Sequence, residues 1–332
     1  MKRCTLPDIA RDLGLSVTTI SRALNDKPDI SPGTKRMVQE KARALAYVSN
    51  GLARDFRRQR TTTIGVVISD NANPFFARVV RGIQNAASAK GYQIILCNTD
   101  EEYTREVTSI QLFRQMCVAG MLITPIQTEE QSILDLVHAN VPFVLISRYF
   151  ANINTDYVVG ADEMGGYLAT SHLIERGYKR IWHLGGPAQI SPATGRSAGY
   201  RRALHDHGID YDEARVIHGH LNMDDGCRAT KQILAQANPP LGIFCFSDYV
   251  AIGAMNALLE EGVAIPDDVA IVGYDDIEFS PYLRVPLTTI DNPRYQIGVK
   301  AVELLVDLIE GRTQLRSNHI VLEPRLIARS ST

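Results

Sequence analysis

The sequence predicts an α/β body of two lobes, each built on a doubly wound parallel sheet, behind a small all-α head. From Thr62 onward, about ten short apolar runs alternate with amphipathic stretches of helical length, as in parallel sheets covered on both faces. About ten strands exceed what one sheet of an ordinary domain uses, which favours two lobes. The first sixty residues show helical spacing instead, and they carry an excess of basic charge.

The composition is that of an ordinary folded protein, with 45% hydrophobic and 22% charged residues in a chain of 332. No apolar run approaches the roughly 18 residues of a membrane span, and the N-terminus lacks the apolar core of a signal peptide. Five scattered cysteines fit a reducing compartment. We therefore expect a cytoplasmic protein that does not contact membranes.

The charge is unevenly distributed along the chain. Residues 1–60 hold 13 Lys and Arg against 6 Asp and Glu, whereas the remaining 272 residues hold 22 against 31. A basic segment in front of an acidic body indicates that only one end of the protein meets a polyanion. The alternative is a solvated basic tail.

The stretch "TLPDIARDLGLSVTTISRALN" predicts two helices joined by a tight turn. Thr5, with an acidic residue three positions on, is typical of a helix start, Gly14 supplies the turn, and Ser16 can cap the second helix. A third helix is expected to start at Ser31. The apolar face of this third helix is expected to consist of Met37, Val38, Ala42 and Leu45.

Three short helices of this kind predict a helix-turn-helix, whose second helix enters the major groove of DNA. Val17, Thr18 and Arg22 would face bases, because Arg donates two hydrogen bonds to guanine and methyl groups meet the thymine methyl. Short polar residues that commonly bind phosphates are Thr5, Ser16, Thr19, Ser21 and Asn25. The alternative is a three-helix bundle that binds no nucleic acid.

These motifs, followed by "ISPGTKRMVQEKARALAY", "NPFF", "GRSAGY" and "VGYDD" in this order, resemble the lactose-repressor/galactose-repressor family of bacterial transcription regulators. The resemblance implies a helix-turn-helix head over 1–48, a hinge over 49–61 and a body over 62–332. The body would be similar to periplasmic sugar-binding proteins, with crossovers between lobes near 160, 291 and 321. It also implies a bacterial protein that lies on the nucleoid when bound to DNA.

As implied partners, we expect a palindromic double-stranded DNA operator, a small-molecule effector and a second copy of the chain. A homodimer is expected rather than a coiled-coil-linked tetramer, because the C-terminal residues lack a heptad pattern. The predicted function is regulation of transcription by sequence-specific DNA binding, with repression as the expected outcome. The alternative is a small-molecule-binding protein without a role in transcription.

The segment between head and body can form a short helix, because Leu52, Ala53 and Phe56 are spaced three or four apart. Alone it is shorter than the roughly 12 residues that a stable helix needs in water. The resemblance implies a hinge helix that inserts an apolar wedge into the minor groove, at a position where the family usually has leucine and this chain has Phe56. Arg54 and three further arginines would face phosphates. The alternative is a disordered basic linker.

Residues that follow the predicted strands indicate a ligand-binding cleft, because ligands bind outside the carboxyl ends of parallel strands. The candidates are Phe75, Phe76, Ser147, Arg148, Asp162, Arg196, Asp248 and Asp275. Carboxylates, arginines and an aromatic pair suit a ligand rich in hydroxyl groups. By resemblance, Asp162, Arg196 and Asp275 match the most regular effector contacts of the family. As alternatives, Asp162 or Asp248 caps a helix, and the phenylalanines belong to the core.

Many relatives carry an Asp-Arg pair where this chain has Ser147-Arg148. The missing carboxylate leaves Arg148 and Arg196 less neutralised, which hints at a sugar acid or sugar phosphate as well as a plain sugar. We expect no metal ion and no cofactor, since neither a metal-ligand spacing nor a nucleotide-binding glycine pattern is present.

The stretch "ATGRSAGY" matches the G-x-S-x-G pattern of a nucleophilic serine at Ser197. A nucleophile elbow needs a strand that runs directly into the serine, whereas here a polar loop precedes Gly195. We also expect that no histidine after Ser197 in the chain returns to it in this fold. The protein is therefore predicted not to be an enzyme.

Overall fold

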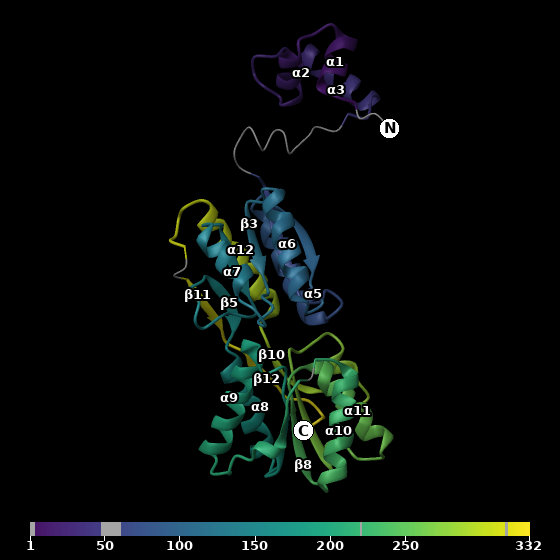
Figure 1. The fold of residues 1–332 in the computed structure, drawn as a ribbon. Helices are drawn as coiled ribbons and strands as arrows, with labels where there is room; N and C mark the ends of the chain where they lie inside the picture. Colours follow the sequence, from purple (N-terminus) through teal and green to yellow (C-terminus); the bar gives the residue numbers. More distant parts are fainter. Residues whose placement is uncertain (1–3, 48–60, 220, 316–317) are drawn as a thin grey trace. The chain divides into compact units, whose positions relative to one another are not determined.

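A computed structural model describes residues 4–47, 61–219, 221–315 and 318–332 of the chain (Figure 1). The chain divides into two compact units, Met1–Thr61 and Thr62–Thr332. No helix in these described ranges is long and apolar enough to cross a membrane.

The first unit is a bundle of three helices, α1 (Leu6–Leu13), α2 (Val17–Leu24) and α3 (Pro32–Ala44). The backbone N–H of Thr5 donates to the Asp8 carboxylate over 2.9 Å at the start of α1. Gly14 ends this helix in the left-handed region, at φ 62°, which glycine adopts without strain. The buried core of the bundle consists of Ile9, Ala10, Ile20, Ala23, Val38 and Ala42. Met37 was expected on this apolar face, but its side chain is 42% exposed.

The first lobe of the second unit has a six-stranded, fully parallel sheet with the order β11-β5-β4-β3-β1-β2. Its strands are β1 (Thr63–Ile68), β2 (Gln93–Asn98), β3 (Gly120–Ile123), β4 (Phe143–Ile146), β5 (Tyr157–Gly160) and β11 (His319–Leu322). Its helices are α5 (Pro74–Ala89), α6 (Tyr103–Gln115), α7 (Gln131–His138) and α12 (Arg294–Ile309). Helices α5 and α12 pack together over one face of the sheet, and α6 and α7 cover the other.

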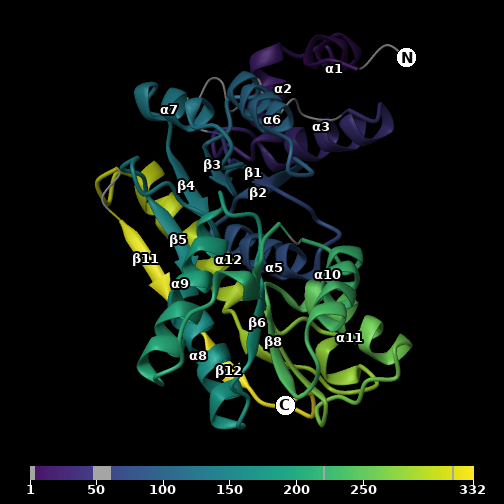
Figure 2. The ribbon, with the colours of Figure 1, turned by 60° about the horizontal axis from the view of Figure 1, so that its bottom comes forward.

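The second lobe repeats this plan with the strand order β12-β10-β9-β8-β6-β7. Its strands are β6 (Ile181–Leu184), β7 (Val216–Ile217), β8 (Leu241–Cys245), β9 (Val269–Tyr274), β10 (Thr288–Asp291) and β12 (Arg325–Ile327). Its helices are α8 (Asp162–Glu175), α9 (Ser191–Asp206), α10 (Met223–Gln236) and α11 (Asp248–Glu260). Strands β6 and β8 lie between the α8–α9 pair and the α10–α11 pair (Figure 2). The edge strand β12 is antiparallel to β10, whereas the other pairs that define this sheet are parallel.

The chain passes between the two lobes three times. The connections run from β5 to α8, from β10 to α12 and from β11 to β12. Each lobe is therefore built from separate stretches of sequence, and the predicted class of two doubly wound α/β lobes is confirmed.

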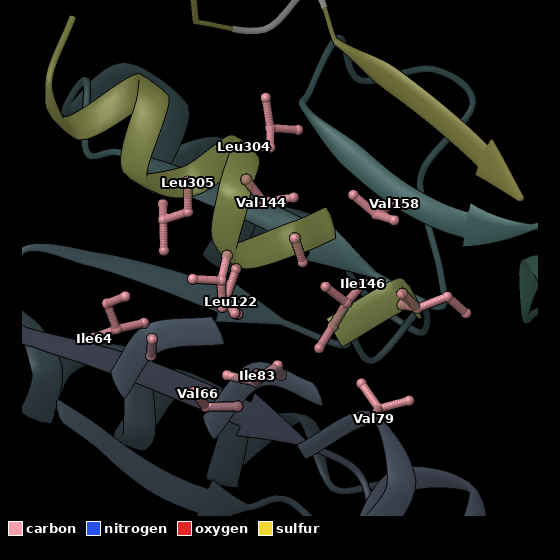
Figure 3. Packing of buried hydrophobic residues seen from close by; sticks show 14 of the residues in the cluster. Ile64, Val66, Val79, Ile83, Leu122, Val144, Ile146, Val158, Leu304 and Leu305 are labelled. Carbon is pink, nitrogen blue, oxygen red and sulfur yellow. The ribbon is translucent and has the colours of Figure 1, made fainter. Parts of the chain in front are cut away.

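Apolar side chains of the strands hold helices α5 and α12 on the first sheet. Val66, Leu122 and Val144 of the strands are fully buried there, together with Ile83 of α5 and Leu305 of α12. Figure 3 shows these side chains gathered between the helices and the sheet. Full burial of an aliphatic side chain of this size stabilises the fold by roughly 1.5–3 kcal/mol. This packing fixes the strands whose carboxyl ends form the candidate site.

Candidate ligand cleft and nucleic-acid interface

A cavity of about 380 Å³ lies between the two lobes, within the range of small-molecule sites. Residues that follow the strands line it, as expected for sheets of this type. The first lobe and α12 contribute Ser69, Asp70, Asn73, Phe75, Phe76, Asp100, Glu101, Ser147, Arg148, Gly160, Asn292 and Ile297. The second lobe contributes Asp162, Ile190, Pro192, Arg196, Leu221, Asn222, Phe246, Ser247, Tyr249 and Asp275.

Arg196 lies in the second-lobe wall of this cavity, where two carboxylates flank it. Its Nε donates to Oδ1 of Asp162 over 2.8 Å, and its Nη2 lies 3.8 Å from Oδ1 of Asp275. Its guanidinium carbon lies 3.6 Å from the ring centroid of Tyr274 and 4.6 Å from that of Phe246. These contacts fix the guanidinium in one orientation.

Burial and charge act against each other on the groups around Arg196. Burial raises the pKa of Asp162 above its ordinary value, although the Arg196 charge opposes this shift. Burial raises the pKa of Asp275 to about 6, again against the attraction of Arg196 and Arg294. Burial lowers the pKa of Arg196, but the charge and hydrogen bond of Asp162, acting together with Tyr274 and Asp275, outweigh it, so this pKa is raised and the guanidinium stays protonated.

The buried polar atoms of the lining that have no hydrogen-bond partner within the described part of the chain include Oγ of Ser147 and Oδ1 of Asn292. Ser147 also has a φ of 63°, which costs free energy in a residue with a side chain. The Nδ2 of Asn292 donates to Asp275 over 3.4 Å. Because an unpaired buried polar atom is costly, these two atoms point to a polar ligand.

Arg148 is paired, in contrast to the expectation that a missing neighbouring carboxylate leaves it less neutralised. Its Nη2 and Nη1 donate to Oε1 and Oε2 of Glu101 over 2.6 and 2.8 Å. Burial raises the pKa of Glu101, but the hydrogen bonds and charge of Arg148, with a smaller contribution from Ser69, outweigh it, so this pKa is lowered and Glu101 is ionised. Glu101 was missed in the sequence, although it lies only three residues after β2, which ends at Asn98.

Asp248 is not a cleft residue in the structure. Its carboxylate is fully buried at the start of α11 and accepts from the backbone N–H of Ile277 and the hydroxyls of Ser280 and Thr289, over 2.9, 2.6 and 2.5 Å. Burial raises its pKa to about 7. The prediction of an effector contact is therefore wrong, because this carboxylate joins α11 to the segment that follows β9 and to strand β10.

The aromatic residues of the cleft come from both lobes. Phe75 and Phe76 line the cavity with ring centroids 4.9 Å apart in an edge-to-face arrangement, and both also belong to the first-lobe core. The effector-contact and core interpretations of this pair are thus compatible. Phe246 and Tyr249 line the second-lobe side and were missed in the sequence. Phe246 follows β8 directly, which is the signal that identifies it.

Hydrogen bonds also join the lobes at the rim of the cleft. The backbone N–H of Ser191 donates to Oε1 of Gln127 over 2.8 Å, and the Ser191 hydroxyl accepts from the N–H of Tyr149 over 3.1 Å. Elsewhere on the rim, the Tyr249 hydroxyl donates to the Ala72 carbonyl over 3.3 Å. The structure therefore represents a state in which the lobes touch across the cleft.

A histidine that precedes Ser197 in the chain does reach it, a case that the prediction about later histidines did not cover. Nε2 of His183 lies 3.1 Å from the Ser197 hydroxyl, and its Nδ1 lies 3.1 Å from the Phe244 carbonyl. His183 precedes Ser197 in the chain and extends from β6. Both side chains are buried beneath α9, and neither lines the cleft. The Ser–His contact therefore lies in the interior, away from the residues that line the cavity.

The surface of the head carries most of the predicted DNA contacts. Thr5, Ser16, Val17, Thr18, Arg22 and Asn25 are exposed, and Thr19 and Ser21 are half-buried. The Ser16 hydroxyl accepts from the N–H of Thr19 over 3.0 Å, which caps α2. Arg22 pairs with Asp29 through two contacts of 2.8 and 2.7 Å. Arg54 and Phe56 lie outside the described residues.

Two family models match this chain. The model "Bacterial regulatory proteins, lacI family" matches residues 5–50, and "Periplasmic binding proteins and sugar binding domain of LacI family" matches residues 61–328. The chain is 33% identical over 329 residues to the HTH-type transcriptional repressor PurR of Vibrio atlanticus (strain LGP32), covering 98% of each protein.

Solved structures give a matching result. A complex of the transcriptional regulator CelR with cellobiose is 31% identical, with a TM-score of 0.77 over 99% of this chain and 100% of that one. The lac repressor dimer bound to operator and the anti-inducer ONPF is 26% identical, with a TM-score of 0.88 over 100% of this chain and 99% of that one.

Proposed function

Because the chain belongs to the LacI family of DNA-binding, ligand-regulated transcriptional repressors, we propose that its operator affinity is controlled by a small hydroxyl-rich carbohydrate in the cleft. The observation that carries this ligand class is the excess of hydrogen-bond acceptors around the cavity. Besides Glu101, whose two oxygens are engaged by Arg148, the lining carboxylates are those of Asp70, Asp100, Asp162 and Asp275. Each hydroxyl of a sugar donates one hydrogen bond, so a ligand with many hydroxyls suits this lining.

The aromatic residues support the same ligand class. Phe75 and Phe76 on one side and Phe246 and Tyr249 on the other offer apolar surface to a sugar ring. The similarity to CelR, which was solved with cellobiose, agrees with this assignment.

A purine base is the second candidate, because relatives named PurR match nearly the whole chain. A planar base would stack on the same aromatic rings. It donates fewer hydrogen bonds than a sugar, however, and would leave more of the carboxylate oxygens unpaired. The orphaned Oδ1 of Asn292 and Oγ of Ser147 add to the number of groups that a ligand has to satisfy.

We further propose that two copies bind a palindromic operator, with one head on each half-site and Phe56 of each chain as the central wedge. The hinge segment, residues 49–61, leads directly into β1 of the first lobe. A ligand that changes how far the lobes close would then alter the separation of the two hinge segments. A coupling of about 1–3 kcal/mol would change operator affinity roughly 5–150-fold.

The test combines a ligand screen with DNA binding. Thermal unfolding of the purified protein is followed with uncharged sugars, sugar acids, sugar phosphates and purine bases, and operator sequences are selected from random duplexes. We expect stabilisation by a carbohydrate, about 2.7 kcal/mol at 100 times its dissociation constant, and a change in affinity for the selected operator. Stabilisation by a purine base and by no carbohydrate would overturn the assignment.

A further inference from the structure

The Arg148–Glu101 pair occupies the first-lobe wall of the cleft. Side-chain exposure is 6% for Arg148 and 33% for Glu101, so the pair is largely withdrawn from water. Both carboxylate oxygens are engaged by the two terminal nitrogens of the guanidinium, which is the geometry in which an arginine binds a ligand carboxylate or phosphate. The Glu101 carboxylate therefore stands where the acidic group of a ligand would bind.

We propose that Glu101 sets the charge selectivity of the cleft. By filling the guanidinium fork of Arg148, it excludes carboxylated and phosphorylated ligands and leaves a site for uncharged ones. This inference rests on the proposed function in assuming that the regulatory ligand occupies this cleft.

The other arginine of the lining cannot take over the role of an anion site. Arg196 donates to Asp162 and to the Phe246 carbonyl, and Asp275 lies 3.8 Å from its remaining nitrogen. An anion at Arg196 would lie beside two carboxylates. Among the residues that line the cavity, Arg148 is thus the cation whose release would create an anion site.

The loop that carries Glu101 is braced by contacts that do not involve Arg148. Asp100 and Glu101 have φ values of 51° and 60°, an uncommon backbone conformation for two successive residues with side chains. Arg105 contacts the Asp100 carboxylate and donates to Glu102 over 3.0 Å. These neighbours hold the loop in place, so a change at position 101 alters the charge at Arg148 while the loop keeps its anchors.

The test compares Glu101→Gln with the wild type, using inorganic phosphate and gluconate as probes in titration calorimetry and thermal unfolding at constant ionic strength. We expect wild-type protein to bind neither probe measurably. Glu101→Gln should bind both anions at least tenfold more tightly than the wild type does, because a neutral amide does not neutralise the Arg148 charge. Glu101→Ser, which opens more room at the fork, is measured in parallel so that one variant remains informative if the other fails to fold.

Two controls isolate the role of Arg148. Asp70→Asn removes one negative charge from the same cavity but leaves the Glu101 loop and the Arg148 pair intact, so it should gain no anion binding. Glu101→Gln combined with Arg148→Gln should lose the gain. An equal gain in Asp70→Asn, or anion binding by the wild type as tight as that of the folded variants, would overturn the proposal.

The outcomes also separate this inference from the proposed function. If the wild type binds an uncharged sugar and neither folded Glu101 variant gains anion binding, the role of Glu101 is wrong and the ligand class stands. If the variants gain anion binding and the wild type binds no carbohydrate, the role of Glu101 stands and the ligand class is wrong.

Discussion

Nε of Arg196 donates to Oδ1 of Asp162 over 2.8 Å, which joins the middle of α9 to the first residue of α8. Asp162 follows the first crossover between the lobes. The pair therefore connects the wall of the cleft to the point where the chain enters the second lobe. Because both groups are buried, removal of either leaves a charge without its partner in the interior.

We expect Arg196→Gln to lower the free energy of unfolding by about 3–5 kcal/mol, since Asp162 and Asp275 lose their cation. The response of operator affinity to the ligand should disappear, while affinity without ligand is retained. Urea unfolding and DNA titration measure the two effects. Arg202→Gln is the matched control, because Arg202 lies on the same helix in an exposed pair with Glu163 and should contribute at most about 1 kcal/mol. Equal losses in both variants would contradict the role of the buried pair.

Gly199 brings α8 and α9 into backbone contact. A Cβ at this position would lie 2.0 Å from the Glu163 carbonyl oxygen and 2.5 Å from the Tyr167 nitrogen, which are backbone atoms and cannot move aside alone. Gly199→Ala should therefore spread the two helices and destabilise the body by roughly 1–3 kcal/mol or more. It should also weaken ligand binding, because Arg196 lies on the displaced helix. Ala198→Ser, at the exposed neighbouring position, should change neither quantity, and a silent Gly199→Ala would contradict this explanation.

The stretch "GRSAGY" shows which features of the site could be predicted from the sequence and which could not. The pattern suggested either a nucleophile or a ligand arginine, and the absence of a strand before Gly195 favoured the arginine. The same reasoning failed for His183, because it considered histidines after Ser197 and not the strand that packs beneath α9. Gly199 is needed because α8 and α9 pack closely. The spacing of apolar residues in the sequence does not show which two helices become neighbours.

The fold class was predictable because alternating apolar runs and amphipathic stretches carry the information for two doubly wound lobes. Strand ends likewise led to Arg196, Asp162 and Asp275. Asp248 follows a strand in the same way, yet it turns into the interior to Ser280 and Thr289. The sequence does not separate a strand-end carboxylate that faces the cleft from one that caps an internal loop. Glu101 was missed because its role depends on Arg148, which lies 47 positions away in the sequence and becomes its neighbour only in the folded protein.

Asp248 makes the stability of the body depend on pH. Its pKa is raised by burial to about 7 in the folded protein, against an ordinary value of 3.8. A folded-state pKa above the unfolded value favours the protonated folded state, so this stabilisation is complete below about pH 4 and is lost as the pH rises to about 7. We expect the free energy of unfolding of Asp248→Asn to fall less than that of the wild type between pH 5 and 8, by up to a few kcal/mol. Urea unfolding across this pH range measures the difference. Asp267→Asn, at an exposed position of the same lobe, should leave the pH profile unchanged.

Arg22 is held on the exposed face of α2 by Asp29. If it reads guanine in the major groove, Arg22→Ala should reduce affinity for the selected operator by about 1–3 kcal/mol and relax discrimination at one base pair. Arg11→Ala removes a charge from α1 that is more exposed, at 78% against 49% for Arg22, and should weaken binding to all sequences alike. Binding to a panel of single-base operator variants distinguishes the two, and unchanged discrimination in Arg22→Ala would remove Arg22 from base readout.

Phe56, outside the described residues, is proposed to enter the central step of the operator as an apolar wedge. Because a wedge recovers the cost of unstacking only where the DNA kinks, Phe56→Ala should weaken operator binding by a few kcal/mol and leave affinity for random duplex nearly unchanged. Phe56→Leu restores the residue that the family usually carries, so it should retain most of the operator affinity while altering the preferred central step. Titrations of both variants against the operator and a scrambled duplex, at one fixed salt concentration, provide the comparison. Equal losses on both duplexes would show that Phe56 contributes only to non-specific contact.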